Sequence, residues 1–344
     1  HVGRERPQRH GFDDDDGANT NRGPDRNDKP NPEEGLAITD RGIAFARAQQ
    51  EKKRPFYLQI SHYGGGSEDE TRPETRALLA AELRGMRGKA AWQAAILRDI
   101  DDQIGRVLAA LDEAGLASTT YVFVVFDHGA SGRDANAPLR GGKGSVYEGG
   151  IRVPFLVRGP GIAAGICSHV RASSSDLLPT VAELAGIAKW PAALEGGSLA
   201  TVLRHRGTGA VARPRPELVV HFPHYDLGSK PASALLLDDY KLVLHYEDAR
   251  CELFDLARDV EERHDLAAKE PERTAELRPT RELPACHRRR HAEDRRSRRR
   301  SRQAARRQAI DLSPAKEQVV GQSRGASEWS CRSERTISSC TVSS

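Results

Sequence analysis

Residues 121–160 read YVFVVFDHGASGRDANAPLRGGKGSVYEGGIRVPFLVRGP, and this stretch decides the fold class. Its first six residues are rich in Val and Phe and too short and β-branched for a helix, so they predict a strand buried on both faces of a parallel sheet. Asp127 and His128 stand at the carboxyl end, where the ligand crevice of an open α/β sheet lies. There a carboxylate and an imidazole can meet a cation or a substrate. The alternative is a plain turn, because Asp-x-Gly is common in turns.

A glycine-rich segment follows, from Arg140 to Gly150, with two cations and one acid among five glycines. Glycines let the backbone approach a ligand closely, and exposed N–H groups beside Lys143 would form a cradle for an anion. The segment is not a Walker loop, because GxxxxGK[ST] is absent. A flexible surface loop is the alternative, but it does not account for the second apolar strand expected at 151–157.

The order and spacing of these residues resemble the sulfatase family of the alkaline-phosphatase-like superfamily. Members of that family carry a strand ending in Asp-Asn-Gly or Asp-His-Gly, followed by LRGGKG-x-x-x-EGG-x-R-x-P. The resemblance implies that Asp127 and His128 bind a divalent metal, calcium or alternatively magnesium, and that Lys143 contacts the sulfate. A carboxylate oxygen suits a hard cation, whereas an imidazole is less usual there and leaves the identity of the metal open.

The beginning of the chain extends the resemblance. His1-Val-Gly and the Gly-Phe-Asp at 11–13 follow the order of a family motif, in which His1 takes the place of an active-site His. The segment 55–60 is expected to be a strand that ends in the family's Ser-x-Tyr pattern. Gly66 stands where the family has a His that contacts substrate. His62 is a candidate substitute, although an ordinary His at a strand end is the interpretation that we favour.

The whole pattern predicts an α/β fold, with a mostly parallel central sheet flanked by helices and a small antiparallel C-terminal subdomain. Apolar residues at helical spacing predict a helix at 91–114, with Asp99, Asp101 and Asp102 on its solvated face. We expect a partial α/β catalytic domain at 1–200, short antiparallel strands with a covering helix at 201–277, and a disordered tail at 278–344.

Two histidines, His221 and His224, lie around the end of a strand expected near residue 218. They are candidates for lining the substrate pocket, and ordinary loop content is the alternative.

Charge is unevenly distributed along the 344 residues. Eleven Arg and two acids between Arg288 and Arg307 give this tail a local charge of +9, which leaves −5 for the remainder. One interpretation is a tail that binds nucleic acid or another acidic surface. Disorder without a role, including a reading-frame error, is the other, and we favour it because no aromatic or helical pattern accompanies the arginines. No nucleic-acid partner is therefore expected, and no apolar run approaches the ~20 residues of a membrane span.

The resemblance implies a sulfuric ester hydrolase of the arylsulfatase type, exported to the periplasm or the extracellular space, that acts on sulfated small molecules or glycans. The family's nucleophile is a formylglycine made from the Cys of a Cys-x-[Pro/Ala]-x-Arg motif. The five cysteines offer no such string, since the nearest, at Cys167, has His169 in the Pro/Ala place, and they form no CxxC pair for zinc or disulfides. We therefore expect a fragment that lacks the N-terminal region and is inactive alone.

Two other functions stay open. One is a phosphomonoester or phosphonate hydrolase of the same superfamily, which would share the Asp-His pair. The other is a non-catalytic relative that binds anions or glycans. The sequence does not indicate an oligomeric state.

Overall fold

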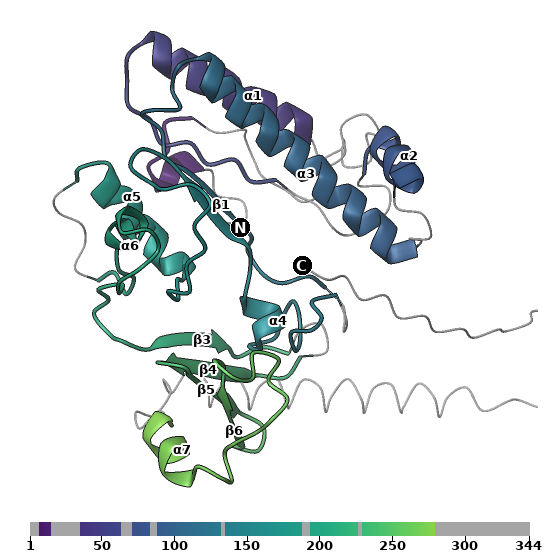
Figure 1. Ribbon diagram of the computed structural model, residues 1–344, viewed down its shortest axis with the longest axis vertical. Helices are drawn as coiled ribbons and strands as arrows, with labels where there is room; N and C mark the ends of the chain where they lie inside the picture. Colours follow the sequence, from purple (N-terminus) through teal and green to yellow (C-terminus); the bar gives the residue numbers. More distant parts are fainter. Residues whose placement is uncertain are drawn as a thin grey trace, which may run out of the picture. The chain divides into compact units, whose positions relative to one another are not determined.

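The computed structural model describes residues 7–14, 35–62, 71–82, 88–131, 135–187, 193–225 and 229–278, all within one compact unit, His1–Arg278. Figure 1 shows the order of the elements. After a short 3-10 turn, η1 (Pro7–His10), come three helices, a two-stranded ribbon and a four-stranded sheet. His1 and the tail expected after Arg278 lie outside the described residues.

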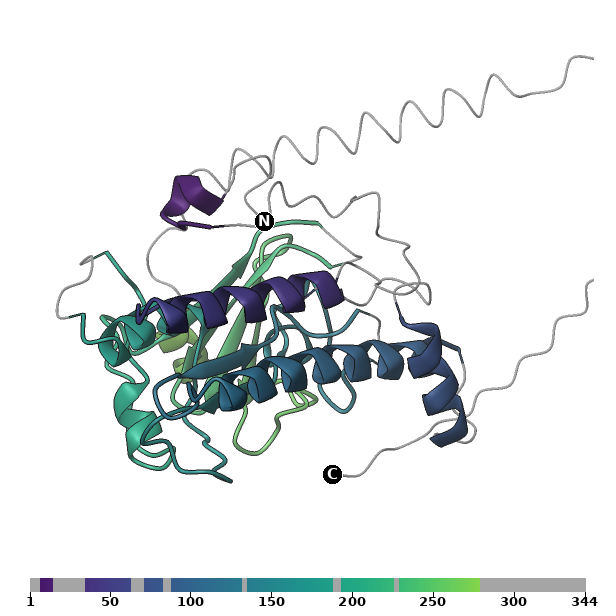
Figure 2. The same cartoon turned by 90° about the horizontal axis from the view of Figure 1, so that it is seen from above.

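The three helices are α1 (Gly35–Glu51), α2 (Pro73–Glu82) and α3 (Gly88–Glu113). α3 confirms the helix predicted at 91–114. Figure 2 shows that α1 and α3 lie side by side, and α2 packs against α3. Helical spacing brings small and aliphatic side chains of α3 onto one buried face: Ala95, Ile96, Ala110 and Leu111.

Asp99 of α3 is buried, with 6% of its surface exposed, so its predicted solvated position is wrong. Arg72, which immediately precedes α2, donates to Asp99 from its backbone N–H at 2.9 Å and from Nε at 2.7 Å. Thr75 Oγ1 donates to the same carboxylate at 2.5 Å. These three donors replace water around the charge, and they fix the beginning of α2 on α3.

The ribbon consists of β1 (Val122–Val125) and β2 (Phe155–Arg158), which pair antiparallel with Val125 opposite Phe155. β1 confirms the predicted strand. Within the described residues its one strand partner is β2, so the parallel pairing remains a prediction. The predicted burial on both faces is wrong, because Val125 is 43% exposed and Leu156 60%. A two-stranded ribbon buries a face only where another element packs on it.

Residues 55–60 pair with no strand in the described part of the chain, contrary to the strand predicted there. Their side chains still alternate, the even-numbered ones partly buried and the odd-numbered ones exposed. Phe56 meets Phe45 of α1 edge-on at 6.0 Å, and a Cβ on Gly42 of the same helix would lie 2.7 Å from Ile60. The alternation of buried and exposed side chains therefore indicates an extended segment that packs one side against α1.

The C-terminal sheet confirms the predicted small antiparallel subdomain. Its four strands follow one another in space as they do in the chain: β3 (Leu218–Phe222), β4 (Ala232–Leu237), β5 (Tyr240–His245) and β6 (Cys251–Asp255). The covering helix is α7 (Pro271–Leu277), whose Leu277 packs against Leu242 and Leu253. On the other face, Val146 from the glycine-rich segment lies in a core with Val243 and Phe254. That segment is therefore built into the C-terminal core.

A short helix, α4 (Glu148–Ile151), lies between the two strands of the ribbon. Three more connect the ribbon to the sheet: η4 (Ser174–Asp176), α5 (Leu177–Leu184) and α6 (Ala200–Arg204). Asp176 is fully buried and forms an ion pair with Arg213, Nη2 to Oδ2 at 2.6 Å. Among the described residues, no helix combines the length and the apolar character that crossing a bilayer requires.

Candidate functional site

Asp127 and His128 contact each other at the end of β1. The Asp127 carboxylate accepts from the His128 backbone N–H at 2.9 Å, and its Oδ2 lies 3.1 Å from His128 Nε2. His128 Nδ1 lies 2.9 Å from the carbonyl oxygen of Gly129 and donates to it, because a carbonyl oxygen can only accept. The Asp127 side chain is 83% exposed and that of His128 36%. A carboxylate oxygen and an imidazole nitrogen thus lie together at an open surface.

The loop that carries Lys143 lies directly against this strand end. The Lys143 backbone N–H donates to the carbonyl oxygen of Ala130 at 3.2 Å, and the Gly129 N–H donates to that of Gly150 at 3.0 Å. The Lys143 side chain is exposed. Two segments that the sequence analysis linked only by resemblance are therefore neighbours in space, joined by backbone hydrogen bonds.

The glycines of this loop permit close packing of backbone against backbone. A Cβ on Gly129 would lie 1.8 Å from the carbonyl oxygen of Gly149, and one on Gly149 would lie 2.6 Å from that of Arg140. Gly141 has a φ of +81°, which a residue with a side chain adopts only under strain. A flexible surface loop does not fit this packing.

The predicted backbone cradle for an anion is wrong for four of the loop's N–H groups. The donors are the backbone N–H groups of Gly142, Lys143, Gly149 and Gly150. The first donates to Ser145 Oγ and the other three donate to backbone carbonyl oxygens, at 2.8 to 3.2 Å. Donors engaged in this way are not available to a ligand. Anion binding here would therefore depend on the ammonium group of Lys143.

Behind the loop, Arg140 connects it to the C-terminal sheet. The guanidinium carbon lies 3.9 Å from the centre of the Tyr147 ring, and Nη2 donates to Glu252 of β6 at 3.2 Å. Tyr147 also donates its hydroxyl to Glu252, and His245 Nε2 lies 2.7 Å from the same carboxylate. The sequence analysis missed this network, because its members are about 100 residues apart and follow no common motif.

Burial and charge shift the pKa values in this network in opposite directions. Burial alone would raise the pKa of Glu252, but hydrogen bonds from His245 and Tyr147 outweigh it and hold that pKa well below its usual range. Burial, together with the Glu252 charge, raises the pKa of Tyr147. Glu252 therefore remains a carboxylate and Tyr147 a neutral donor, which keeps Arg140 in place.

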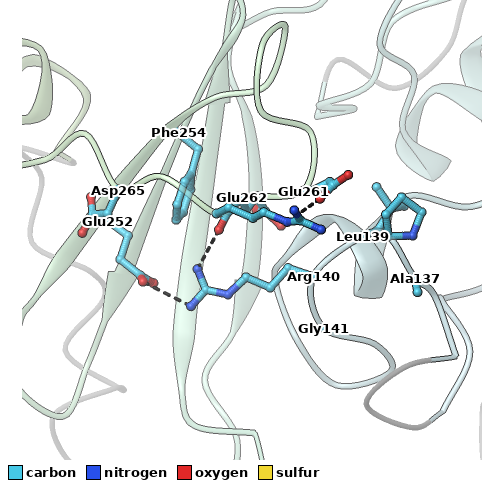
Figure 3. Close-up of a pocket in the computed structure, with 11 residues that line it drawn as sticks. Ala137, Leu139, Arg140, Gly141, Glu252, Phe254, Glu261, Glu262 and Asp265 are labelled. Carbon is cyan, nitrogen blue, oxygen red and sulfur yellow. Dashed lines mark hydrogen bonds and ion pairs between the residues drawn. The ribbon is translucent and has the colours of Figure 1, made fainter. Parts of the chain in front are cut away.

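An open cavity of about 670 Å³ lies beside this network (Figure 3). Residues 137–141 line one side, and the other is lined by Glu252, Phe254, residues 261–263 and Asp265. Figure 3 shows Arg140 paired with the Glu252 carboxylate. None of the residues predicted for the site lines it, so it is separate from the Asp127–Lys143 region.

Three other histidines predicted for the site each contact residues other than Asp127, His128 and Lys143. His62 Nε2 is 3.0 Å from Thr39 Oγ1 of α1, and burial lowers its pKa. His221 Nδ1 is 2.5 Å from Ser233 Oγ, within the C-terminal sheet. His224 meets Phe222 edge-on at 5.5 Å. The His62 contact favours the ordinary strand-end interpretation, and a pocket role for His221 and His224 stays a prediction.

The donors present fit only part of a metal site. In the described part of the chain, no three His, Cys, Asp or Glu side chains gather where they could hold a metal. Asp127 and His128 supply two donors, whereas Ca²⁺ takes six to eight oxygen ligands.

The family model described as Sulfatase matches residues 6–187, more than half of the chain. This chain belongs to the sulfatase family. A second family model, described as N-sulphoglucosamine sulphohydrolase, C-terminal, matches residues 142–284. The two family models together match most of the described residues, the glycine-rich loop included.

Curated sulfatases agree with this assignment, and a solved structure shows the fold. A sulfatase of Formosa agariphila is 32% identical over 257 residues, covering 68% of this chain and 46% of the relative. The steryl-sulfatase of Mus musculus is 34% identical over 198 residues, covering 54% and 29%. The chain therefore spans less than half the length of these curated relatives. The crystal structure of Ps i-CgsB matches with a TM-score of 0.62 and 22% identity, over 71% of this chain and 52% of that one, and shows the shared fold.

Proposed function

We propose that this chain forms part of the active site of a sulfuric ester hydrolase, an arylsulfatase-like enzyme that cleaves sulfate esters with a divalent metal. Family membership supports this reaction class. The observation that carries the proposal is the backbone hydrogen bond from Lys143 to Ala130, which joins the backbone of an exposed lysine to the segment directly after Asp127 and His128.

In this function Lys143 binds the sulfate group through its positive charge. Asp127 and His128 contribute two ligands to the metal, and the hydrogen bond from His128 Nδ1 to Gly129 orients the ring with Nε2 toward the Asp127 carboxylate. The metal, calcium or magnesium, would neutralise negative charge on the sulfate oxygens. Sulfatases generally also use a formylglycine, but the 344 residues contain no Cys-x-[Pro/Ala]-x-Arg string. We therefore expect this chain to bind sulfate without turning it over.

Sulfated carbohydrates are the substrate class that we infer. Ps i-CgsB, which shares the fold, has a crystal structure in complex with k-i-k-neocarrahexaose, a 23% identical match with a TM-score of 0.62. The open surface around Asp127 leaves room for a chain-like ligand to extend beyond the sulfate.

Calorimetry on the 344-residue chain tests the proposal, with inorganic sulfate, inorganic phosphate and a sulfated oligosaccharide as probes, with and without Ca²⁺. We expect sulfate to bind more tightly than phosphate. Lys143→Ala should weaken sulfate binding about ten- to hundred-fold, the effect of losing one charge-assisted contact. Lys269→Ala, which removes an exposed lysine near α7, is the matched control and should bind like the wild type.

Three results would count against the proposal. Equal sulfate affinity in the wild type and Lys143→Ala would remove the role of Lys143. Preference for phosphate would favour a phosphomonoester hydrolase. Turnover of an aryl sulfate well above buffer would show that the chain supplies its own nucleophile, contrary to the expected inactivity.

A further inference from the structure

Both ends of the loop that carries Lys143 bind one residue of the C-terminal segment, Glu262. At the beginning of the loop, Arg140 Nη1 donates to the carbonyl oxygen of Glu262 at 3.2 Å, a contact drawn in Figure 3. At its end, the backbone N–H of Glu148 donates to Glu262 Oε2 at 2.7 Å. The two ends also meet each other, because the Gly149 N–H donates to the carbonyl oxygen of Arg140 at 2.8 Å.

Glu262 is itself held firmly in place. It is 1% exposed, and its φ of +57° lies in the left-handed region that a Glu adopts only when its surroundings enforce it. Its Oε1 lies 2.8 Å from Nζ of Lys241, which is fully buried on β5. The same ammonium group lies 3.0 Å from Glu148 Oε1. A buried cluster of three charges thus joins β5, α4 and the segment around Glu262.

These contacts leave the loop with three fixed points. Its beginning and end are fixed by Glu262, and its centre by the hydrogen bond from Lys143 to Ala130. Short segments fixed at both ends have few conformations to lose when a ligand binds, so the position of the Lys143 backbone depends on both anchors.

We propose that Glu262 is a positioning residue for the sulfate site: by fixing both ends of residues 140–148, it sets where the Lys143 ammonium group can lie. The identity of the ligand rests on the proposed function, whereas the anchoring of the loop does not. The C-terminal subdomain then contributes to sulfate binding through the loop, without touching the ligand.

Glu262→Gln separates this role from folding. Its amide keeps the size of the side chain but has only one oxygen. That oxygen can accept from the Glu148 N–H or from the Lys241 ammonium group, but not from both. Lys241 retains its partner Glu148, so the buried ammonium group is still paired. The matched control is Glu261→Gln, because Glu261 lines the same cavity but pairs with Arg263.

Two measurements on the full chain decide the proposal: hydrogen exchange of peptides covering 140–150 and 232–245, and calorimetry with inorganic sulfate in Ca²⁺. Glu262→Gln should speed exchange of the loop about ten-fold while β4 and β5 exchange as in the wild type. Sulfate affinity should fall about ten-fold. Glu261→Gln should change neither quantity.

Each outcome has a definite meaning. A folded Glu262→Gln whose loop exchange and sulfate affinity equal those of the wild type overturns the proposal. Faster exchange in the loop and in β4 and β5 alike would also overturn it, because Glu262 would then support the fold in general. A wild type that binds no sulfate contradicts the proposed function, and loop exchange still decides the anchoring. Should Glu262→Gln not fold, Arg140→Gln releases the other anchor, and an unchanged loop in that variant overturns the proposal.

Discussion

The side-chain amide of Asn136 binds both backbone groups of Ala130. The Ala130 N–H donates to Asn136 Oδ1 at 2.8 Å, and Asn136 Nδ2 donates to the Ala130 carbonyl oxygen at 2.9 Å. Nδ2 also lies 3.2 Å from the carbonyl oxygen of Gly141. One short side chain therefore joins the segment after His128 to the loop that carries Lys143. Side chains of Asn often replace missing backbone partners in this way.

Asn136→Ala is expected to separate these two segments. The variant removes three hydrogen bonds around Ala130 and Gly141, so the free energy of unfolding should fall by about 1–3 kcal/mol in urea titrations. Sulfate affinity should fall as well, because the Lys143 loop loses a connection to the strand end. Asn136→Asp is a second variant: it can still accept from the Ala130 N–H, but it sets a carboxylate oxygen against the carbonyl oxygens of Ala130 and Gly141, so it should lose stability as well. Equal stability of Asn136→Ala and the wild type would contradict this role.

Gly129→Ala tests the close packing of the loop. The added Cβ would lie 1.8 Å from the carbonyl oxygen of Gly149, so the strand end and the loop must move apart. We expect a loss of about 1–3 kcal/mol or more in the free energy of unfolding. Gly105→Ala is the matched control, since no atom lies within 4 Å of its Cβ position in α3, and there the change should stabilise by about 1 kcal/mol. If both variants melt at the same temperature, the packing is not as close as described.

Local pattern predicted the elements of this fold well. The apolar periodicity of α3, the Val- and Phe-rich run of β1 and the short strands before residue 255 each depend on neighbours within one element. The motif around Lys143 placed the chain in the sulfatase family, which the family models confirm.

The contacts between elements could not be predicted in this way. Asp99 had the spacing of a solvated residue and is buried, because Arg72 pairs with it from 27 positions away. Glu262 and Glu148, 114 positions apart, have no signal in common, yet they share a hydrogen bond. The glycines near Lys143 suggested a ligand cradle, whereas they serve backbone packing. The sequence showed that glycines near Lys143 allow close approach of the backbone. Only the tertiary structure shows that they approach other backbone segments.

The carboxylate of Glu252 is expected to make the fold sensitive to acid. Its pKa is held below the ordinary value of 4.5 in the folded state, since hydrogen bonds from His245 and Tyr147 outweigh the effect of burial. A carboxyl whose pKa is depressed by folding stabilises the fold above its unfolded pKa, and this contribution is lost as the pH falls below about 4.5 toward the folded value. The wild type should therefore lose stability as the pH falls from about 5 to about 3.

Urea unfolding across that range tests the role of Glu252. Glu252→Gln should be about 1–3 kcal/mol less stable than the wild type near neutral pH, because Arg140 and His245 lose a charged partner. The difference should shrink as the pH falls, since protonation of this carboxyl in the unfolded wild type favours unfolding while the folded wild type still holds the charge. Glu272→Gln, which changes an exposed carboxyl of α7, should follow the wild type at every pH. A gap between Glu252→Gln and the wild type that stays constant down to about pH 3 would mean that Glu252 acts through packing and not through its charge.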